Sequence, residues 1–556
     1  MRENYNSNVL QRPLIVGVSA RLPKILLTII ALSHGVLILF LALNTPADFY
    51  NAPDEAANAM FARGIKEEGQ LIRPITRPDL PSSVVPRGVH RTRQGLIPVG
   101  VVSVPIILGS LAKVAGIKGV PFVIALFCSL GILAWYHFLR PLFGNKLAII
   151  ASQILALHPF VLYWGGRPFM PNALFLSLLL ISLFFLSRVL WPTGPSRSST
   201  EAVVFEKPFS VEPMFRRRAS SCMFGFFLGL AIAVRPQEGV WVILIPLILL
   251  LRPSLRRFLA WQFFIPAFLL PIGSLLVAQT TLYGAPLQTG YHLTPAASSP
   301  LHLIQALLFP FGFNAERVAT VAYAYLFKIV WPFAGLTAIG ILSLLLKKNG
   351  VVGERLRKAA TFTLLLGLWL LFYYGSFEFY DRFDHNPVSI GNSFGRYFLP
   401  LYVLSSIFIA SALLMIRKYV GRFITVMVVC GITVFSLALV FWGSDESFAR
   451  IAGVSRENRE IKTAILEATP LDAIILTDRA DKILYPEREV VTVFRSAKFS
   501  QSRFEELYTY SLYYDTIASP EVVAIENEKF WGPHGLRAIE PVPVGYRHTL
   551  YRLKVL

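Results

Sequence analysis

Two adjacent acids, Asp54 and Glu55, stand where a carboxylate could take part in catalysis. They follow Pro53 shortly after the apolar run Ile25–Leu43, in a segment otherwise rich in arginine and proline. A carboxylate held at the boundary between water and lipid can act as a general base, because it can take a proton from a hydroxyl group. The alternative is structural, since acids in the first turn of a helix interact favourably with the helix dipole. A helix start would also help to keep the carboxylate ionised, as a base must be.

Cations that could bind a phosphate occur at two later places. Arg235 interrupts the apolar run Cys222–Leu251. Arginine at membrane depth costs about 3 kcal/mol on insertion scales, so a functional reason is expected for it. The structural alternative is a cation that snorkels to the membrane surface or fixes the topology. Arg396 and Tyr397 begin a later apolar run, where they fit either a phosphate site or an ordinary interfacial anchor.

The chain that must position these residues has the composition of a membrane protein. Of its 556 residues, 54% are hydrophobic and 15% are charged, whereas soluble proteins carry about 25% charged residues. Long apolar runs recur from Ile25 to Trp442 and then stop. Most of the relevant Lys and Arg lie in short links between these runs, which is typical of cytoplasmic loops and argues against nucleic-acid binding. The three cysteines lie inside apolar runs, so we expect neither a disulfide nor a metal site from them.

The charges in the links predict how the spans are oriented. Basic clusters on both sides of the run Cys222–Leu251 should be cytoplasmic, so the break at Arg235 lies near the outer face. Applied to every link, the same rule predicts a multi-pass plasma-membrane protein with about eleven crossings, a cytoplasmic N-terminus and an extracytoplasmic C-terminal stretch. The run Ile97–Ala115 contains two prolines and two glycines. We expect it to lie in the interface or to re-enter, because proline disfavours a regular spanning helix.

Two extracytoplasmic segments are long enough to have structure of their own. In the first outer loop, 44–95, a surface helix should begin near Pro53 and end near Gly69, since proline favours helix starts and glycine helix ends. Its apolar residues, among them Ala59 and Phe61, would rest on the bilayer. After the transmembrane domain 1–442, the stretch 443–556 has the pattern of a small soluble α/β domain. Its expected elements are strands over Ala473–Thr477, Glu489–Val493 and Val522–Ile525 and a helix over Gln501–Tyr514.

A series of motifs in the outer loops resembles those of a known class of membrane enzymes. The motifs are Pro53-Asp54-Glu55, His158-Pro159-Phe160, Gly166–Asn172, Gly225–Arg235, Tyr283–Pro286 with Gly290-Tyr291, and Gly395–Tyr397 with Pro400. Together they resemble the GT-C glycosyltransferases, in particular the protein O-mannosyltransferases and the aminoarabinose-transferase-like members. Each motif is weak alone, and the resemblance becomes specific through their order and their common face.

The resemblance implies a GT-C-like polytopic helical fold and an inverting hexosyl- or pentosyltransferase that uses a polyprenyl-phosphate sugar. The acceptor would be a hydroxyl or amine of a lipid, glycan or protein at the outer membrane face. Asp54 matches the acid of the family's first outer loop, which is assigned as the base or as part of a metal-dependent site. Arg235 matches the cation that meets the donor phosphate, and Tyr397 matches a tyrosine on the same group. Arg396 and Arg167 are further candidates for phosphate contacts, and this prediction rests on their position and chemistry alone.

This chain departs from the family in its number of acids. Many relatives carry a second acid where this chain has Asn172. Hard cations such as Mg²⁺ or Mn²⁺ need several oxygen ligands, so a required divalent cation is not predicted, although the family leaves one open. Glu55, Asn172 and His292 are candidates for contacts with the acceptor or with such a cation. For His292 the simpler reading is an interfacial histidine.

Two other kinds of function compete with the transferase. A transporter or flippase for a lipid-linked or anionic substrate would also keep ionisable residues near the membrane centre, but it predicts internal repeats and acids within the spans. The sequence shows no convincing repeat, and its acids gather in the outer loops. A non-catalytic scaffold with a partner-binding outer domain gives no reason for Arg235 on the same face as Asp54. We therefore favour the transferase.

Overall fold

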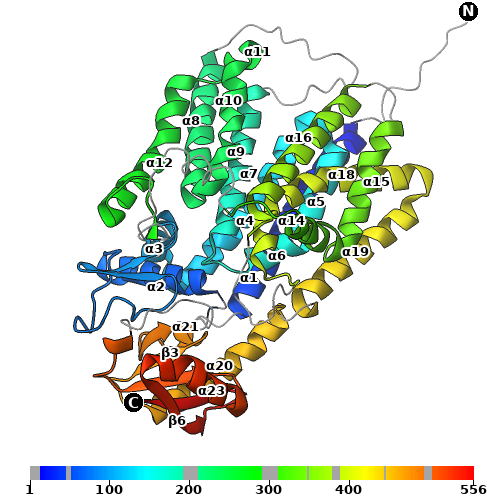
Figure 1. Ribbon diagram of the computed structural model, residues 1–556. Coiled ribbons are helices and arrows are strands. Elements are labelled where there is room, and N and C mark those ends of the chain that lie inside the picture. The colour runs from blue at the N-terminus through cyan, green and yellow to red at the C-terminus, as the bar shows by residue number, and fades with distance from the viewer. Residues whose placement is uncertain are drawn as a thin grey trace, which may run out of the picture.

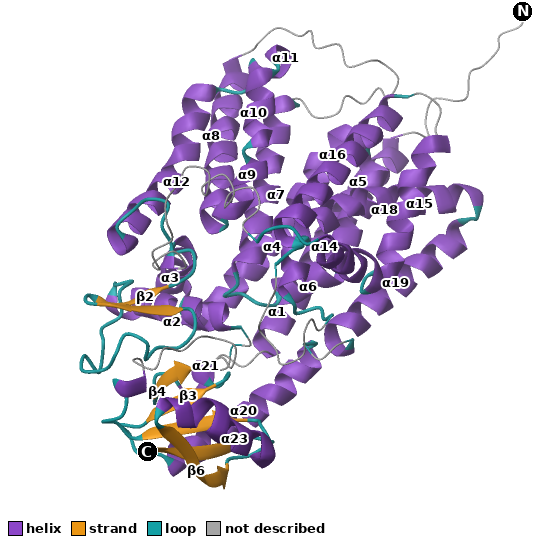
Figure 2. Ribbon diagram, in the orientation of Figure 1, coloured by secondary structure: helices purple, strands orange, loops and turns teal. Residues whose placement is uncertain are grey.

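The computed structural model is a bundle of helices with a small sheet domain at one end (Figure 1, Figure 2). It describes residues 13–44, 50, 52–191, 211–290, 311–346, 350–377, 388–443, 446–493 and 504–556. Eight described helices are long and apolar enough to cross a membrane. They are α1 (Pro13–Asn44), α4 (Val120–Phe143), α7 (Pro171–Leu190), α8 (Val211–Val234), α12 (Trp261–Tyr283), α16 (Val351–Tyr374), α18 (Leu399–Tyr419) and α19 (Arg422–Trp442). The chain is therefore an integral membrane protein.

Two further pairs of helices pass the same test together but are bent at a short break. In the first pair, α5 (Asn145–Ala156) and α6 (Pro159–Gly165) are bent by 56°. In the second, the helical segment Ala315–Lys328, which begins with α14 (Ala315–Ala322), is bent by 91° from α15 (Trp331–Leu346). Each pair counts as one further crossing if it spans the membrane, which gives up to ten.

A shorter arm, Pro236–Leu251, accounts for the difference from the eleven crossings expected. It contains the turn Pro236–Glu238, α9 (Gly239–Val242) and α10 (Leu244–Leu251). At 1.5 Å per residue it is shorter than the roughly 30 Å of a bilayer core. It nevertheless leads to α11 (Pro253–Arg256), which lies at the end of the bundle opposite the C-terminal domain (Figure 1). This arm therefore runs back along the bundle after the break at Arg235, as the charge pattern predicts.

The apolar run Ile97–Ala115 does not form one helix. Its start belongs to strand β2 (Gly95–Pro98), which pairs antiparallel with β1 (Val89–Thr92). Helix α3 (Ser103–Ala115) follows. Its 13 residues extend for only about 20 Å, too short for a crossing. The run is thus a strand followed by a short helix, and it is not among the candidate membrane spans.

The surface helix of the first outer loop is present with the expected ends. It is α2 (Pro53–Glu68), and Gly69 ends it with φ 72°, a left-handed conformation that glycine adopts without strain. The prediction that Ala59 and Phe61 rest on lipid is wrong, because both side chains are fully buried within the protein. Packing against α3 and the bundle covers this face of the helix.

The C-terminal domain has an α/β fold, as predicted. Its five-stranded sheet has the order β4-β3-β5-β7-β6, in which β3 is parallel to β4 and β5, and β7 is antiparallel to both of its neighbours. The strands are β3 (Ile474–Thr477), β4 (Glu489–Thr492), β5 (Leu512–Thr516), β6 (Leu536–Pro543) and β7 (Thr549–Val555). Helix α20 (Phe448–Ala468) covers one face of the sheet, and α23 (Pro520–Glu526) with the buried Trp531 covers the other. Every residue of β3 is buried, as expected for a central strand covered on both faces.

Two of the four elements predicted for this domain are wrong. The expected strand Val522–Ile525 lies in α23, which begins with Pro520 and Glu521, both favourable at a helix start. The expected helix Gln501–Tyr514 ends in strand β5, while its first residues lie outside the described part of the chain. Short apolar runs fit either type of element, and here packing against the sheet decided between them.

A buried carboxylate connects a histidine to the sheet. Asp515, in β5, accepts hydrogen bonds from Thr477 (Oγ1 to Oδ2, 2.9 Å) and from His548 (Nδ1 to Oδ1, 2.8 Å). Burial lowers the pKa of His548, but the hydrogen bond with Asp515 and its negative charge outweigh burial, so the pKa is raised above 6.5.

The raised pKa predicts how the stability of the domain depends on pH. Charged His548 stabilises the fold fully below its unfolded pKa of about 6.5, and this contribution is lost as pH rises through the higher folded pKa. We expect the protection factors of amides in β5 and β7, which correct for the intrinsic rise of exchange with pH, to fall over that range in the wild type and to depend less on pH in His548→Gln. Identical pH profiles for the two proteins would contradict the assignment.

The first outer loop docks onto the C-terminal domain. Leu80 and Val84 belong to the hydrophobic core of that domain, and Val85 forms a parallel bridge with Val491 next to the sheet. The two segments must therefore lie on the same side of the membrane. The proposed boundary between 442 and 443 coincides with the end of α19, but residues of the loop complete the core beyond it.

Candidate active site

The first turn of α2 directs its two acids to different places. Pro53 occupies the first turn with Asp54 and Glu55. The side chain of Asp54 is 40% exposed, and its Oδ2 lies 3.5 Å from Nη1 of Arg396. The side chain of Glu55 is 2% exposed, and its Oε2 accepts hydrogen bonds from Nη2 (2.6 Å) and Nε (3.1 Å) of Arg167. Asp54 is therefore the acid that a substrate can reach.

The Glu55–Arg167 pair fastens α2 to the helix bundle. Arg167 lies in the turn between α6 and α7. One turn further along α2, Asn58 donates to the carbonyl oxygen of Phe169 in the same segment (2.9 Å). These contacts attach one face of α2 to the segment between α6 and α7. Glu55 and Arg167 thus bind each other, whereas the sequence suggested an acceptor or metal contact for the first and a phosphate contact for the second.

Breaking this pair should reduce stability. Removing one partner of a buried ion pair leaves the other charge uncompensated, which costs about 3–5 kcal/mol. We expect Arg167→Gln to lower the free energy of unfolding by this amount, and a second change, Glu55→Gln, to restore part of it. The control is Glu354→Gln in the exposed pair Glu354–Lys358 (2.6 Å), which should change little. Equal stability of Arg167→Gln and the control would refute the assignment.

Arg235 lies at the break after α8 and is 1% exposed. Its Nη1 donates to Oδ1 of Asn172 (2.9 Å) and to the carbonyl oxygen of Arg396 (3.4 Å). Its Nη2 lies 3.0 Å from Oε1 of Glu238. The guanidinium also lies over the ring of Tyr397, 5.4 Å from the centroid. A carboxylate, an amide and an aromatic face therefore hold this cation in one orientation.

Glu238 belongs to this cluster, although the sequence analysis gave it no role. It is fully buried, and besides its ion pair with Arg235 it accepts hydrogen bonds from Nε1 of Trp241 (2.6 Å) and from the hydroxyl of Tyr374 (2.9 Å). Its signal in the sequence is an acid three positions after the arginine of the break, a spacing that brings side chains together on a helical turn. Glu238 is thus a positioning residue for Arg235.

A short helix connects the acid to the cation. This helix is α17 (Ser393–Tyr397), and the side chain of Asn392 caps its first turn. Arg396 approaches Asp54 with its guanidinium, while its backbone carbonyl accepts a hydrogen bond from Arg235. Asp54 and Arg235 are far apart in the sequence but both contact Arg396, Asp54 through the guanidinium and Arg235 through the backbone carbonyl. The structure therefore brings Asp54, Arg235, Arg396, Tyr397 and Asn172 together.

Some buried donors in this cluster have no hydrogen-bond acceptor among the described residues. They are Nε and Nη2 of Arg235 and Nδ2 of Asn172. Nη2 is close enough to Glu238 for an ion pair, but not in hydrogen-bond geometry. Buried donors are nearly always satisfied, so donors left open together mark a place for an acceptor. The Nε–Nη2 edge of a guanidinium matches two oxygens of a phosphate or carboxylate.

The remaining predicted contacts concern a histidine and a metal ion. His292 lies outside the described residues. Within the described part of the chain, no group of three or more His, Cys, Asp or Glu side chains is placed to hold a metal ion. Among the described residues of the cluster, Glu55 is engaged by Arg167, which leaves Asp54 as the exposed carboxylate. This donor set does not fit a divalent cation, which needs several oxygen ligands.

The helix bundle, the amphipathic first-loop helix and the C-terminal sheet domain define a polytopic membrane protein with a GT-C-like fold. The structure is similar to that of ArnT from Cupriavidus metallidurans bound to undecaprenyl phosphate, with a TM-score of 0.55 and 11% identity over 94% of this chain and 97% of that one. It also matches the oligosaccharyltransferase of Archaeoglobus fulgidus, with a TM-score of 0.44 and 12% identity over 90% of this chain and 70% of that one. No protein-family model and no curated protein matches the sequence.

Proposed function

We propose that the protein is an inverting glycosyltransferase that moves a sugar from a polyprenyl-phosphate donor to a hydroxyl or amine of an acceptor at the outer membrane face. The observation that carries this proposal is the set of open buried donors on Arg235 and Asn172, joined through α17 to the exposed carboxylate of Asp54. Displacement of a phosphate requires a site that binds the leaving anion and, close to it, a base that the acceptor can reach. The undecaprenyl phosphate bound to ArnT, a protein of similar fold, supports a lipid phosphate as this anion.

The reaction is a single displacement at the anomeric carbon. Asp54 takes the proton of the acceptor hydroxyl, and the oxygen forms a bond to the anomeric carbon on the face opposite the phosphate. The bond between that carbon and the phosphate oxygen breaks, and its electron pair leaves with the polyprenyl phosphate. The anomeric configuration is therefore inverted. Asp54 acts as the general base in this step.

The cations act on the leaving group. Negative charge grows on the phosphate as the bond breaks, and preorganised donors stabilise such charge most in a site without water. Arg235 offers its Nε–Nη2 edge, and Asn172 offers Nδ2. Arg396 contacts Asp54 through its guanidinium and Arg235 through its backbone carbonyl, so its positive charge lies close enough to act on the departing phosphate as well.

The sidedness of the site follows from charge and contact together. The loop that carries Asp54 and the C-terminal domain are in contact and so lie on one side of the membrane. Basic links predict that this side is extracytoplasmic and that the N-terminus is cytoplasmic. Sugar transfer would then take place at the outer face, on a lipid, glycan or protein acceptor.

The function is tested with the full-length protein reconstituted in lipid vesicles and supplied with a panel of polyprenyl-phosphate hexoses and pentoses. The proposal predicts release of polyprenyl phosphate and transfer of the sugar to an acceptor in a membrane extract. A transporter would instead move the intact donor between leaflets without consuming it. Leaflet exchange without cleavage of the sugar–phosphate bond would overturn the transferase and favour a flippase.

A further inference from the structure

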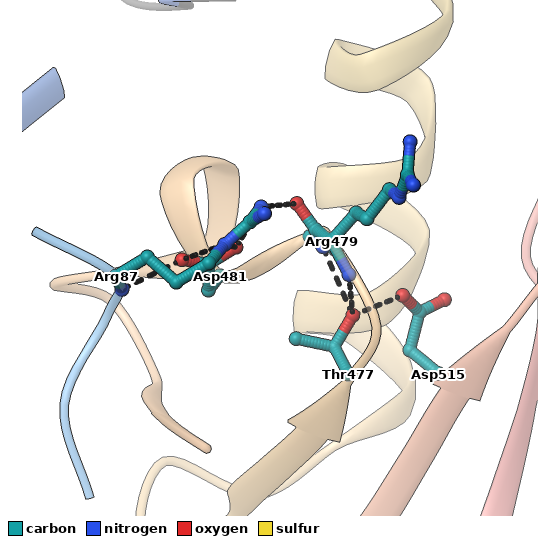
Figure 3. A network of polar contacts seen from close by, with 6 residues as sticks. Arg87, Thr477, Arg479, Asp481 and Asp515 are labelled. Atoms are coloured by element: carbon teal, nitrogen blue, oxygen red, sulfur yellow. Dashed lines mark hydrogen bonds and ion pairs between the residues drawn. The ribbon is translucent and has the colours of Figure 1, made fainter. Parts of the chain in front are cut away.

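The C-terminal domain makes an ionic contact with the first outer loop in which the carboxylate is fully buried, while the Arg87 side chain is 17% exposed. Asp481 is 0% exposed and accepts hydrogen bonds from the backbone N–H of Arg87 (2.8 Å) and from its Nη2 (2.8 Å) and Nε (3.2 Å) (Figure 3). Hydrogen bonds that other described loop residues make with the domain, such as that between Thr76 and Glu489 (3.2 Å), are exposed. Buried charge-assisted pairs with two or more hydrogen bonds are the costly ones to break. Among these polar contacts between the described residues of the two segments, the Arg87–Asp481 pair is therefore the one expected to cost most to break.

Hydrogen bonds at the end of β3 hold the segment that carries Asp481 against the sheet. Thr477 ends β3, and its Oγ1 accepts hydrogen bonds from the backbone N–H groups of Arg479 (3.3 Å) and Ala480 (2.9 Å) while donating to Asp515 (2.9 Å). Arg87 also donates from Nη2 to the carbonyl oxygen of Arg479 (3.3 Å). Figure 3 shows this continuous network from Asp515 in the sheet to Arg87 in the loop. Asp481 is thus fixed relative to the core of its domain.

On its other side, Arg87 is joined to the helix that carries Asp54. The next residue, Gly88, has φ +81°, and a Cβ atom there would lie 3.0 Å from Cβ of Ala57 and 3.3 Å from the carbonyl oxygen of Pro53. The backbone at Gly88 therefore rests directly on the first turn of α2. Any larger residue would have to displace that turn or adopt a strained backbone.

We propose that the Arg87–Asp481 pair is a clamp through which the C-terminal domain positions the catalytic carboxylate of Asp54. The pair holds Gly88 against Pro53 and Ala57, the residues on either side of Asp54 in the first helical turn. This inference rests on the proposed function of Asp54. Arg235 is held by Asn172 and Glu238, which do not belong to this network.

The separation of the two networks predicts a specific kinetic signature. Loosening the clamp should misplace the base and lower kcat, while the phosphate site stays intact and KM for the lipid donor changes by less than about twofold. A displacement of about 1 Å can reduce a rate about 100-fold, so we expect Asp481→Asn and Arg87→Gln to lower kcat about 10- to 100-fold. The double variant should lose no more than either single one, because both changes remove the same contact.

The experiment compares these variants with Glu487→Gln. Glu487 lies in the same domain, and its carboxylate pairs with Lys462 of α20 (2.7 Å) and not with Arg87, so this variant also neutralises a carboxylate but leaves the Arg87–Asp481 pair intact. Amide hydrogen exchange of residues 54–57 is measured alongside turnover, and this measurement does not depend on activity. We expect faster exchange there in Asp481→Asn and unchanged exchange in Glu487→Gln.

Two results would overturn the clamp. One is wild-type turnover together with wild-type amide exchange at residues 54–57 in Asp481→Asn. The other is an equal loss of turnover and of polyprenyl-phosphate binding, which would make the pair a general contribution to folding. If the proposed function itself failed, the wild type would process no polyprenyl-phosphate sugar. The exchange measurement would still show whether the Arg87–Asp481 pair holds the first turn of α2.

Discussion

Turnover by an Asp54→Asn protein is expected to fall about 100- to 10,000-fold, the usual contribution of a general base. The change keeps the size of the side chain and removes the group that takes the proton. Because Asp54 is 40% exposed and its contact with Arg396 is long, at 3.5 Å, the fold should be unaffected. The measurement is the rate of sugar release from a polyprenyl-phosphate donor at saturating acceptor concentration.

Asp79 provides a matched control for this experiment. It lies in the same outer loop and forms an exposed pair with Arg77 (2.9 Å). Asp79→Asn makes the same chemical change in the same segment, and we expect it to retain wild-type turnover. If Asp54→Asn and Asp79→Asn turned over equally fast, Asp54 would not be the base. A selective loss in Asp54→Asn, with binding of polyprenyl phosphate retained, would separate the base from the phosphate site.

The second large effect is expected at Arg235. Arg235→Lys should lower kcat about 100- to 1,000-fold, because losing one preorganised donor from a developing anion has this effect in other enzymes. Lysine keeps the positive charge, so Glu238 is not left buried without a cation. It lacks the paired N–H groups that match two phosphate oxygens. Binding of polyprenyl phosphate to the purified protein should weaken in parallel.

Arg355 supplies the control for this change. It donates from Nη1 to the carbonyl oxygens of Pro141 (3.1 Å) and Leu142 (2.9 Å), at the end of α4 away from the candidate site. Arg355→Lys should leave turnover and binding of polyprenyl phosphate unchanged. Wild-type affinity and turnover in Arg235→Lys would show that the open donors of this residue do not meet the phosphate.

Local patterns were sufficient to predict much of the architecture. Apolar runs identified the spans, because a helix is the form in which a single segment satisfies its backbone inside a membrane. Pro53 and Gly69 marked the ends of α2, since both act through their own backbone geometry. The break at Arg235 was equally visible as a polar interruption in an apolar run. The strand assigned to Val522–Ile525 failed because its apolar residues also fit a helix packed on a sheet.

The types of residue in the candidate site were also visible in the sequence, but their pairing was not. Asp54 and Glu55 are neighbours with similar chemistry, yet Glu55 turns inward to Arg167, 112 positions away, and Asp54 faces Arg396. The role of Glu238 depends on Tyr374, 136 positions away. Contacts of this kind depend on how distant helices cross and which faces they bury, and no local pattern records either. Chain position and hydropathy thus predict that acids and cations gather at one membrane face, whereas packing between remote segments decides which carboxylate stays open to a substrate.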